Sequence, residues 1–287
     1  MNQPSAARPV AVRLGDGRLH LQHGPIDLII EAFGDRQEVE AAYAQAFARF
    51  GDVLSTLVLE LSALRQPVGD AHPLLRGPVA RRMAQAVWPH RAGYITPMAA
   101  VAGAVADEIL AAMKRGRTLD KAYVNNGGDI AFHLAHGQEL RAGIFVDALH
   151  GAARLTHDRP VRGIATSGWG GRSFSLGIAD TVTVLAKDAA SADAAATIVA
   201  NAVDADHHLI VRQAASLLDP DSDLGNLQVT TAVGRLPQSV VDAALDRGAE
   251  EARRLQRLGL IEAAALSLKG SWRIQGTGAL AKRAEAG

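Results

Sequence analysis

The chain has 287 residues, 48% of them hydrophobic, and its thirty basic side chains balance thirty acidic ones. Proteins that neutralise nucleic-acid phosphates normally carry a basic excess or stripe, so this balance argues against nucleic acid as a partner. The sequence contains no cysteine, which excludes disulfides, thiolate metal sites and cysteine nucleophiles.

The start of the chain lacks the long apolar core of a signal peptide. The most apolar stretch begins at Met98 and meets Asp107 and Glu108 well short of the roughly 20 residues that a membrane span needs. We therefore expect a cytoplasmic protein without a membrane partner.

The first part of the chain predicts a hairpin, a strand and helices. Residues 10–14 and 19–22 flank an Asp-Gly turn, and residues 26–32 form the next apolar run. Apolar residues at three-and-four spacing between 39 and 64 predict one helical face. Three prolines then separate that helix from a shorter one ending near Trp88.

Thr96 and Pro97 mark a helix start, with Thr96 as N-cap and Pro97 in the first turn. The helix that follows, residues 98–115, is rich in Ala and Gly. Further strands are expected at residues 122–125, 130–134, 139–146, 163–166 and 181–186. A helix at 191–203, another at 238–258 and a strand at 259–268 complete the pattern, and the tail after Gly276 looks frayed.

Strands and helices thus come in blocks, which favours an α+β fold over a doubly wound sheet. No linker is long enough to separate independent domains. We expect a single domain over residues 1–287 and leave open whether it has two lobes.

The first stretch that could carry chemistry follows the strand at 122–125. Gly127 and Gly128 permit positive φ and a close approach to a ligand, and Asn126 and Asp129 add polar groups. These four residues are candidate cofactor-binding residues. A simple hairpin turn is the alternative.

The second stretch runs from Ala165 to Arg172. Its glycines and hydroxyl residues are typical of a nest of backbone N–H groups that binds an anion. Arg172 is a candidate for pairing with phosphate, and Trp169 for stacking on a planar ring. A flexible loop is the alternative. The candidate cofactor-binding residues of this stretch are Thr166, Ser167, Gly168, Trp169 and Arg172.

The third stretch places Asp193 and Thr197 four residues apart on a helix, so both oxygens face the same way. A carboxylate and a hydroxyl suit Mg²⁺, which completes its shell with water and phosphate oxygens. Ordinary helix-start chemistry is the alternative, with Ser191 as the cap and Asp193 complementing the helix dipole.

Together these stretches resemble the ApbE-like superfamily, the fold of the FAD:protein FMN transferases. The shared segments are the small-residue helix, the Gly-Gly-Asp turn at 127–129, Ala-Thr-Ser-Gly at 165–168, and Ala-Asp-Ala-Ala-Ala-Thr at 192–197. These four motifs occur in the family's order over residues 95–205. Four motifs in the same order indicate the family far more specifically than any single motif does. Segments 97–104 and 24–29 are similar to an uncharacterised cytosolic sub-branch without a lipoprotein signal.

The resemblance implies mixed or antiparallel sheets packed with helices. It implies that Asp193, Thr197 and a backbone carbonyl near Val101 bind Mg²⁺. It also places the Gly127-Gly128 turn and the 166–168 loop beside a nucleotide, with FAD or FMN as candidate cofactor.

Two departures weaken the case for the transferase reaction. The family's Lys-Gly step is Ala102-Gly103 here, and residues 173–180 lack the His and Pro that the transferases carry in this segment. Transfer of FMN to a protein threonine requires activation of the threonine hydroxyl next to the pyrophosphate. Both departures remove residues that are expected to orient the substrate or to assist that step.

The sequence therefore predicts a Mg²⁺-dependent protein that binds a nucleotide, a flavin or another small phosphorylated ligand, without genuine protein flavinylation. The alternatives are an accessory role in sulfur assimilation into homocysteine, with which the resembling sub-branch has been associated, and a non-catalytic binding module. A homo-oligomer is also left open.

Overall fold

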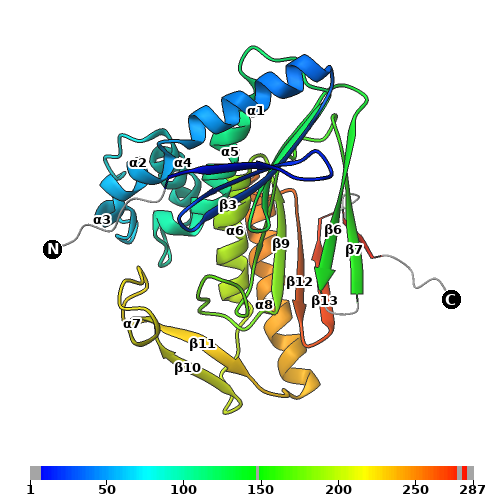
Figure 1. The fold of residues 1–287 in the computed structure, drawn as a ribbon. Helices are drawn as coiled ribbons and strands as arrows, with labels where there is room; N and C mark the ends of the chain where they lie inside the picture. Colours follow the sequence, from blue (N-terminus) through cyan, green and yellow to red (C-terminus); the bar gives the residue numbers. More distant parts are fainter. Residues whose placement is uncertain (1–7, 147–148, 277–279, 283–287) are drawn as a thin grey trace.

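A computed structural model describes residues 8–146, 149–276 and 280–282 (Figure 1). Its centre is a nine-stranded sheet in which all neighbouring strands run antiparallel. The expectation of an α+β fold with antiparallel sheets is confirmed. In spatial order the strands are β1 (Val10–Arg13), β2 (Leu19–His23), β3 (Ile26–Phe33), β4 (Lys121–Asn126), β5 (Asp129–Leu134), β8 (Gly163–Ser167), β9 (Thr181–Ala186), β12 (Ala263–Leu268) and β13 (Ser271–Gln275).

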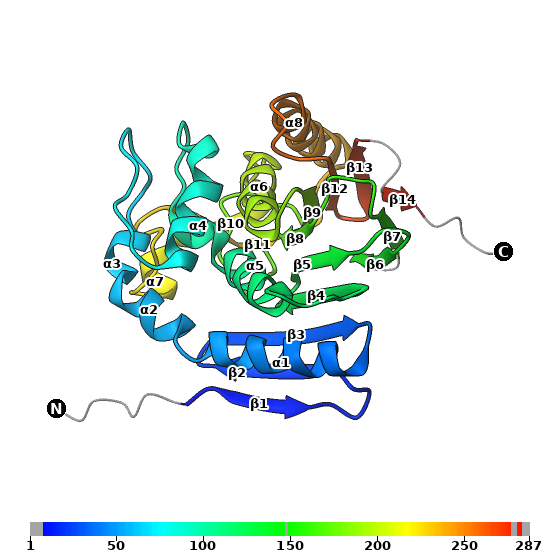
Figure 2. The same ribbon diagram turned by 90° about the horizontal axis from the view of Figure 1, so that it is seen from above.

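Helices α5 (Val101–Lys114), α6 (Ala189–Ala202) and α8 (Gln238–Arg257) lie against one face of this sheet (Figure 2). Their facing positions are dominated by alanine and glycine, and short side chains let α5 and α6 come close to each other and to the strands. Strong burial on this face matches the Ala-rich pattern of the sequence.

The long helix expected over residues 39–64 is wrong, because the segment forms three helices. They are α1 (Arg36–Phe50), α2 (Val53–Leu59) and α3 (Leu61–Leu64). The chain turns at Asp52 and Glu60, where ψ is close to zero, so the expected apolar face is broken. Phe47 and Val58, which that face included, are largely exposed.

The connection to α5 begins with α4 (Pro78–Val87) and the 3₁₀ turns η1 (Trp88–His90) and η2 (Pro97–Ala100). The Thr96 hydroxyl oxygen accepts a hydrogen bond from the Met98 N–H at 3.2 Å, so the predicted N-cap is confirmed. The first turn is 3₁₀ rather than α-helical, and α5 starts at Val101.

The opposite face of the sheet is partly covered by a smaller sheet that the sequence predicted only in part. It contains β6 (Glu139–Val146), β7 (Leu149–Thr156) and β14 (Leu280–Lys282). Strand β7 was missed because its Ala- and Gly-rich sequence shows little alternation. Leu280–Lys282 pair with β7, so this part of the tail is not frayed, whereas 277–279 and 283–287 lie outside the described residues.

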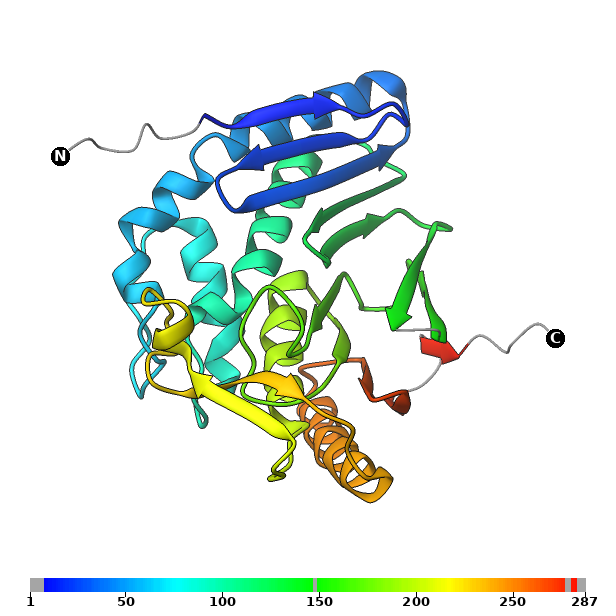
Figure 3. The same ribbon diagram turned by 60° about the horizontal axis from the view of Figure 1, so that its bottom comes forward.

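A two-stranded arm, β10 (Ile210–Ala214) and β11 (Gln228–Val233), carries the short helix α7 (Ala215–Leu218) at its tip (Figure 3). The sequence did not predict it. The arm is tied back to the start of η2, where the Thr96 hydroxyl donates to the Asp223 carboxylate. The C-terminal strand expected at 259–268 begins only at Ala263, because Gly259 turns the chain with φ +69°.

None of the helices within the described ranges combines the length and the apolarity that a membrane crossing requires.

Candidate functional site

The first candidate stretch is a tight turn between β4 and β5. Gly127 and Gly128 have φ of +64° and +113°, so the predicted positive φ is confirmed. The Asn125 side-chain oxygen accepts a hydrogen bond from the Gly128 N–H at 2.8 Å, which holds the turn closed. The hairpin alternative is therefore correct as a description of the backbone, and it leaves the neighbouring polar side chains free to build a site.

Two of those side chains lie on the sheet face that α5 and α6 cover. Asn126 is buried, and its side-chain N–H donates to the Ala102 carbonyl at 3.0 Å. Asp129 pairs with Asn126 across the strands and is also buried. One Asp129 oxygen, Oδ1, accepts a hydrogen bond from the Thr166 N–H at 3.2 Å. The turn, α5 and β8 thus converge on this point.

Helices α5 and α6 cap each other. Asp193 of α6 accepts a hydrogen bond from the Gly103 N–H in the first turn of α5 at 3.0 Å. Asp107 of α5 accepts from the Ala189 and Ala190 N–H groups in the first turn of α6, at 3.1 and 2.9 Å. A carboxylate near a helix N-terminus satisfies unpaired N–H groups and complements the helix dipole.

The cap of α6 itself was predicted wrongly. Asp188 rather than Ser191 is the N-cap, and its carboxylate accepts from the Ser191 N–H at 2.7 Å. Helix α6 starts two residues before Ser191 because Ala189 and Ala190 already find acceptors in Asp107.

Asp193 and Asp129 face each other as a carboxyl pair. Burial raises the pKa of Asp129 to about 7, although Thr166, Asp193 and Arg172 act in the opposite direction. Burial, and then the charge of Asp129, raises the pKa of Asp193 well above its usual value. Two buried carboxyls this close cannot both ionise cheaply unless a proton or a cation lies between them.

The two other predicted metal ligands, Thr197 and the backbone carbonyl near Val101, lie on α6 and α5. Thr197 is one turn after Asp193 on α6 and is half-buried. No hydrogen bond of its hydroxyl is found within the part of the chain that the structure describes. Val101 is the first residue of α5, and the carbonyl of the next residue, Ala102, already accepts from Asn126.

The second candidate stretch differs from the predicted nest. The Trp169 N–H donates to the Ala179 carbonyl at 3.0 Å, and the Gly171 N–H to the Gly168 carbonyl at 3.3 Å. Successive N–H groups are therefore not free to bind one anion. The loop folds back on residues 179–180 instead, and a Cβ at Gly168 would lie 2.2 Å from the Asp180 carbonyl oxygen.

Trp169 is held by the protein. Its indole N–H donates to Asp180 Oδ1 at 3.0 Å, and its ring packs against the core between the sheet and α8. The Asp180 carboxylate also accepts from the Lys269 N–H. These contacts explain the position of Trp169, and its stacking on a ligand stays a prediction.

Thr166 and Ser167 point to opposite sides of β8. Alternation places Ser167 with Ala165 on the helix-covered face. Thr166 points to the other face, where its hydroxyl lies 2.9 Å from the Thr183 hydroxyl. Thr166 therefore contributes its N–H, rather than its hydroxyl, to the carboxyl pair.

Arg172 lies over the glycine turn. A Cβ on Gly127 would be 1.7 Å from a terminal guanidinium nitrogen of Arg172, so only glycine leaves room for this arrangement. Among the described residues Arg172 forms no ion pair, although its charge lowers the pKa of Asp129. An exposed guanidinium beside a buried carboxyl pair is available to an anionic ligand.

The comparison with known proteins accounts for this combination of elements. A family model described as "AbpE bacteria" matches residues 11–274. The chain belongs to this ApbE-like family.

This ApbE-like chain is also similar to archaeal proteins named UPF0280 protein. It is 35% identical to that of Methanoculleus marisnigri over 70% of the chain and 79% of the relative. It is 38% identical to that of Methanothrix thermoacetophila over 52% of the chain and 62% of the relative. It is 40% identical to that of Methanospirillum hungatei over 45% of the chain and 52% of the relative. The match thus spans 79% of the Methanoculleus marisnigri protein but only 52–62% of the other two relatives.

Solved structures with a similar arrangement include flavin transferase ApbE from Vibrio cholerae, at 14% identity and a TM-score of 0.44. That alignment covers 94% of this chain and 97% of the other. The flavinyl transferase ApbE of Pseudomonas stutzeri, in its apo form, aligns at 12% identity and a TM-score of 0.45, over 96% and 97% of the two chains.

Sequence reasoning missed two residues that shape the candidate site. Asp107 organises the start of α6, and a charge within the otherwise apolar run from Met98 was the signal that could have identified it. Asp180 ties the 168–171 loop to Lys269, and nothing in its local sequence distinguishes it from an ordinary surface Asp.

Proposed function

We propose that this protein holds Mg²⁺ between Asp129 and Asp193 and binds a nucleotide or flavin phosphate beside it. The observation that carries the proposal is a facing pair of carboxyls, Asp129 buried and Asp193 half-buried, whose pKa values are both raised. A divalent cation offsets two adjacent negative charges, and it would take the place of the shared proton. The raised pKa values mean that both groups are usable as ligands once a cation compensates the burial.

The donor set fits a hard cation. Asp129 and Asp193 supply two carboxylates, and Thr197 adds a hydroxyl one helical turn after Asp193 on α6. No cluster of three or more His, Cys, Asp or Glu side chains occurs in the described residues. Mg²⁺ is commonly held by one or two carboxylates, with water and phosphate oxygens as further ligands.

The phosphate side of the proposal rests on Arg172 and the glycine turn. The guanidinium lies against Gly127 and is exposed. Around Gly128 and Gly170, no heavy atom lies within 4 Å of an added Cβ, so the backbone is open to a ligand. FAD and FMN are the candidate ligands of first choice because both carry phosphate together with a planar ring.

When bound, Mg²⁺ would supply electrophilic activation of a phosphoryl group. The chain's own residues would hold the cation with two carboxylates, orient the phosphate through Arg172 and fix the turn through Asn125 and Asn126. We further propose a cytoplasmic location. The sulfur-assimilation role and the non-catalytic binding module stay predictions.

The test measures melting temperature with Mg²⁺ and FAD, FMN or ADP, and again with chelator. A ligand at about 100 times its Kd stabilises the native state by roughly 2.7 kcal/mol, which raises Tm by about 5 °C for a chain of this length. We expect this shift for at least one ligand with Mg²⁺ and a much smaller one with chelator. Asp193→Asn should abolish the Mg²⁺-dependent part, and Thr197→Val should reduce it less.

Asn at position 193 keeps an oxygen that accepts from the Gly103 N–H, so this variant separates the charge from the helix cap. Asp107→Asn is the matched control, because it alters the reciprocal cap without touching the carboxyl pair. If Asp193→Asn responds to Mg²⁺ as the wild type does, or if Asp107→Asn loses the response equally, the metal assignment is wrong.

A further inference from the structure

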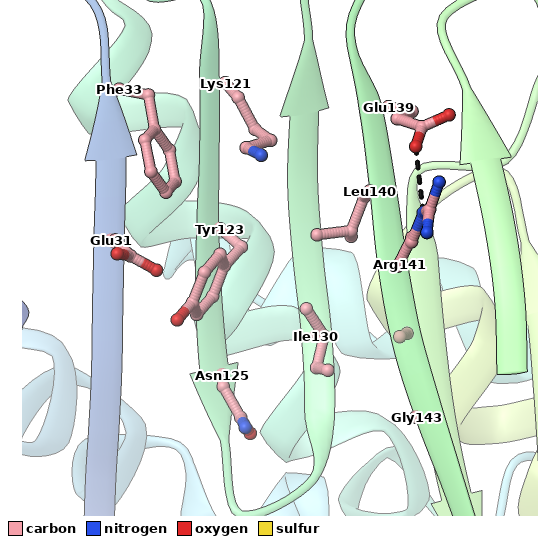
Figure 4. A pocket seen from close by; sticks show the side chains of 11 residues that line it. Glu31, Phe33, Lys121, Tyr123, Asn125, Ile130, Glu139, Leu140, Arg141 and Gly143 are labelled. Atoms are coloured by element: carbon pink, nitrogen blue, oxygen red, sulfur yellow. Dashed lines mark hydrogen bonds and ion pairs between the residues drawn. The ribbon is translucent and has the colours of Figure 1, made fainter.

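A cavity lies on the sheet face that α5 and α6 do not cover. It measures about 560 Å³, within the range typical of small-molecule sites. Its floor is formed by side chains of β3, β4 and β5, and its wall by residues 139–143 of β6 (Figure 4). It is built entirely from residues that the structure describes.

The cavity and the carboxyl pair are separated by the sheet. Lys121, Tyr123 and Asn125 alternate along β4 and point together into the cavity (Figure 4). Asn126, the next residue, points to the other face and donates to the Ala102 carbonyl of α5. A ligand in the cavity would therefore bind independently of Asp129 and Asp193.

The charges of the lining leave one cation without a carboxylate partner. The Lys121 ammonium lies 4.4 Å from the centroid of the Phe33 ring, and no ion pair of Lys121 is found within the described ranges. Of the two acids, Glu139 is bound by Arg141 at 2.9 Å and Arg154 at 2.7 Å.

The other acid, Glu31, faces the Tyr123 hydroxyl. Burial, followed by the influence of Glu31, raises the pKa of Tyr123 to about 12, so the phenol keeps its proton. The Lys121 ammonium is therefore the group of the lining that can meet an anion.

The middle of the cavity suits a flat ring. Tyr123 presents an aromatic ring, and Ile130 and Leu140 present aliphatic side chains toward the same space (Figure 4). Ala142 and Gly143 keep the β6 wall thin. The Asn125 amide stands at the end opposite Lys121, where it can meet a polar ring substituent.

We propose that this cavity binds a small planar anion, a molecule with one or two fused aromatic rings and a single carboxylate or phosphate group. The ring lies against Tyr123, Ile130 and Leu140, and the anionic group meets the Lys121 ammonium. The ring supplies contact area and the charge supplies selectivity against neutral analogues of the same shape.

The test is a methyl NMR titration of the metal-free protein with four probes. Indole-3-carboxylate and 1-naphthyl phosphate carry the ring and the anion, indole-3-carboxamide is the neutral analogue, and acetate lacks the ring. We expect the two ring-bearing anions to shift the methyl signals of Ile130 and Leu140 and to leave that of Ile109, a buried residue of α5, unchanged. The stronger of the two identifies the anionic group that the site prefers.

Lys121→Met should weaken binding of the better probe about tenfold or more, the loss expected for a charge-assisted hydrogen bond. Tyr123→Leu should weaken it about threefold or more through the lost ring contact. Lys187→Met, at an exposed lysine after β9, is the matched control and should bind as the wild type does.

Three results would overturn the proposal. The first is an absence of Ile130 and Leu140 shifts up to the solubility limit of both ring-bearing anions. The second is equal binding of the carboxamide and the carboxylate. The third is a Lys121→Met variant that melts like the wild type and binds both anions unchanged.

Discussion

Asp129 and Asp193 are opposed side chains whose environment favours a shared proton. Both pKa values are raised chiefly by burial. The native state then binds protons more tightly than the unfolded chain, in which an Asp titrates near pH 4. The stabilisation linked to this pair is complete below about pH 4 and is lost as the pH rises through the native pKa, about 7 for Asp129.

The first prediction follows from that linkage. In chelator, the free energy of unfolding of the wild type relative to Asp129→Asn should fall between about pH 4 and pH 7, by up to about 1.4 kcal/mol per pH unit for one proton. Urea unfolding at several pH values measures it. His90, whose pKa burial lowers to about 4, changes stability in the opposite direction and cancels in the difference. A pH-independent difference would contradict the shared proton.

The second prediction concerns Gly128, whose φ of +113° strains any L side chain. No atom lies within 4 Å of an added Cβ there, so the cost is in the backbone alone. Gly128→Val should cost of order 1 kcal/mol or more, which lowers Tm by about 2–4 °C, and should weaken Mg²⁺-dependent flavin binding. Gly69→Val, outside the proposed site, is the control, with equally open space and no positive φ. Unchanged melting and binding in Gly128→Val would reduce the turn to a tolerant hairpin.

At the level of secondary-structure elements, the contact between α5 and α6 positions the candidate metal site. Gly103 lies against the α6 backbone, and a Cβ there would be 2.3 Å from the Ala189 carbonyl oxygen. The same contact brings the Gly103 N–H to Asp193. The small residues predicted for this helix therefore allow α5 to pack closely against α6. That packing also sets the position of Asp193.

The third prediction is that Gly103→Ala destabilises the protein by about 1–3 kcal/mol, because two helix backbones must separate. It should also weaken Mg²⁺ binding, since Asp193 moves with α6. Gly15→Ala, which places a Cβ in open space without positive φ, should leave unfolding almost unchanged. Chemical denaturation of both variants measures the difference. Equal stabilities would show that α5 and α6 accommodate the added methyl group without separating, which would contradict the prediction.

For the molecule as a whole, the segment 173–180 links the site to other parts of the fold. The Ser175 carbonyl accepts from the Thr230 N–H of the arm at 2.9 Å. A Cβ at Gly177 would lie 2.1 Å from the Ala200 carbonyl oxygen of α6. Asp180 binds Trp169. This segment, which lacks the His and Pro of the transferases, joins the sheet, α6 and the arm.

The fourth prediction is that the protein does not transfer FMN to a threonine peptide. Incubation with FAD, Mg²⁺ and a flavin-acceptor peptide, followed by mass spectrometry of the peptide, tests it. The reason is the missing His and Pro, since the hydroxyl has no evident activating group. A peptide mass increase matching one FMN would contradict the prediction, while leaving the metal assignment intact.

Local patterns were enough to predict much of the chain. Residues 10–33, the cap at Thr96, the glycine turn and the strands β4, β5, β8 and β9 follow from alternation, turn chemistry and capping, which act over a few neighbouring residues. The order of the motifs was also sufficient to indicate the family that the match over residues 11–274 establishes.

Other features depend on contacts between distant segments. Strand β7 needs β6 and β14 beside it, and the break-up of the 39–64 helix follows turns that a regular apolar spacing concealed. Asp129 and Asp193 are separated by 63 intervening residues, and neither position predicts that the two carboxyls face each other. The two carboxyls meet because α6 packs against α5 next to the β4–β5 turn. Burial at this contact then raises the pKa of both groups.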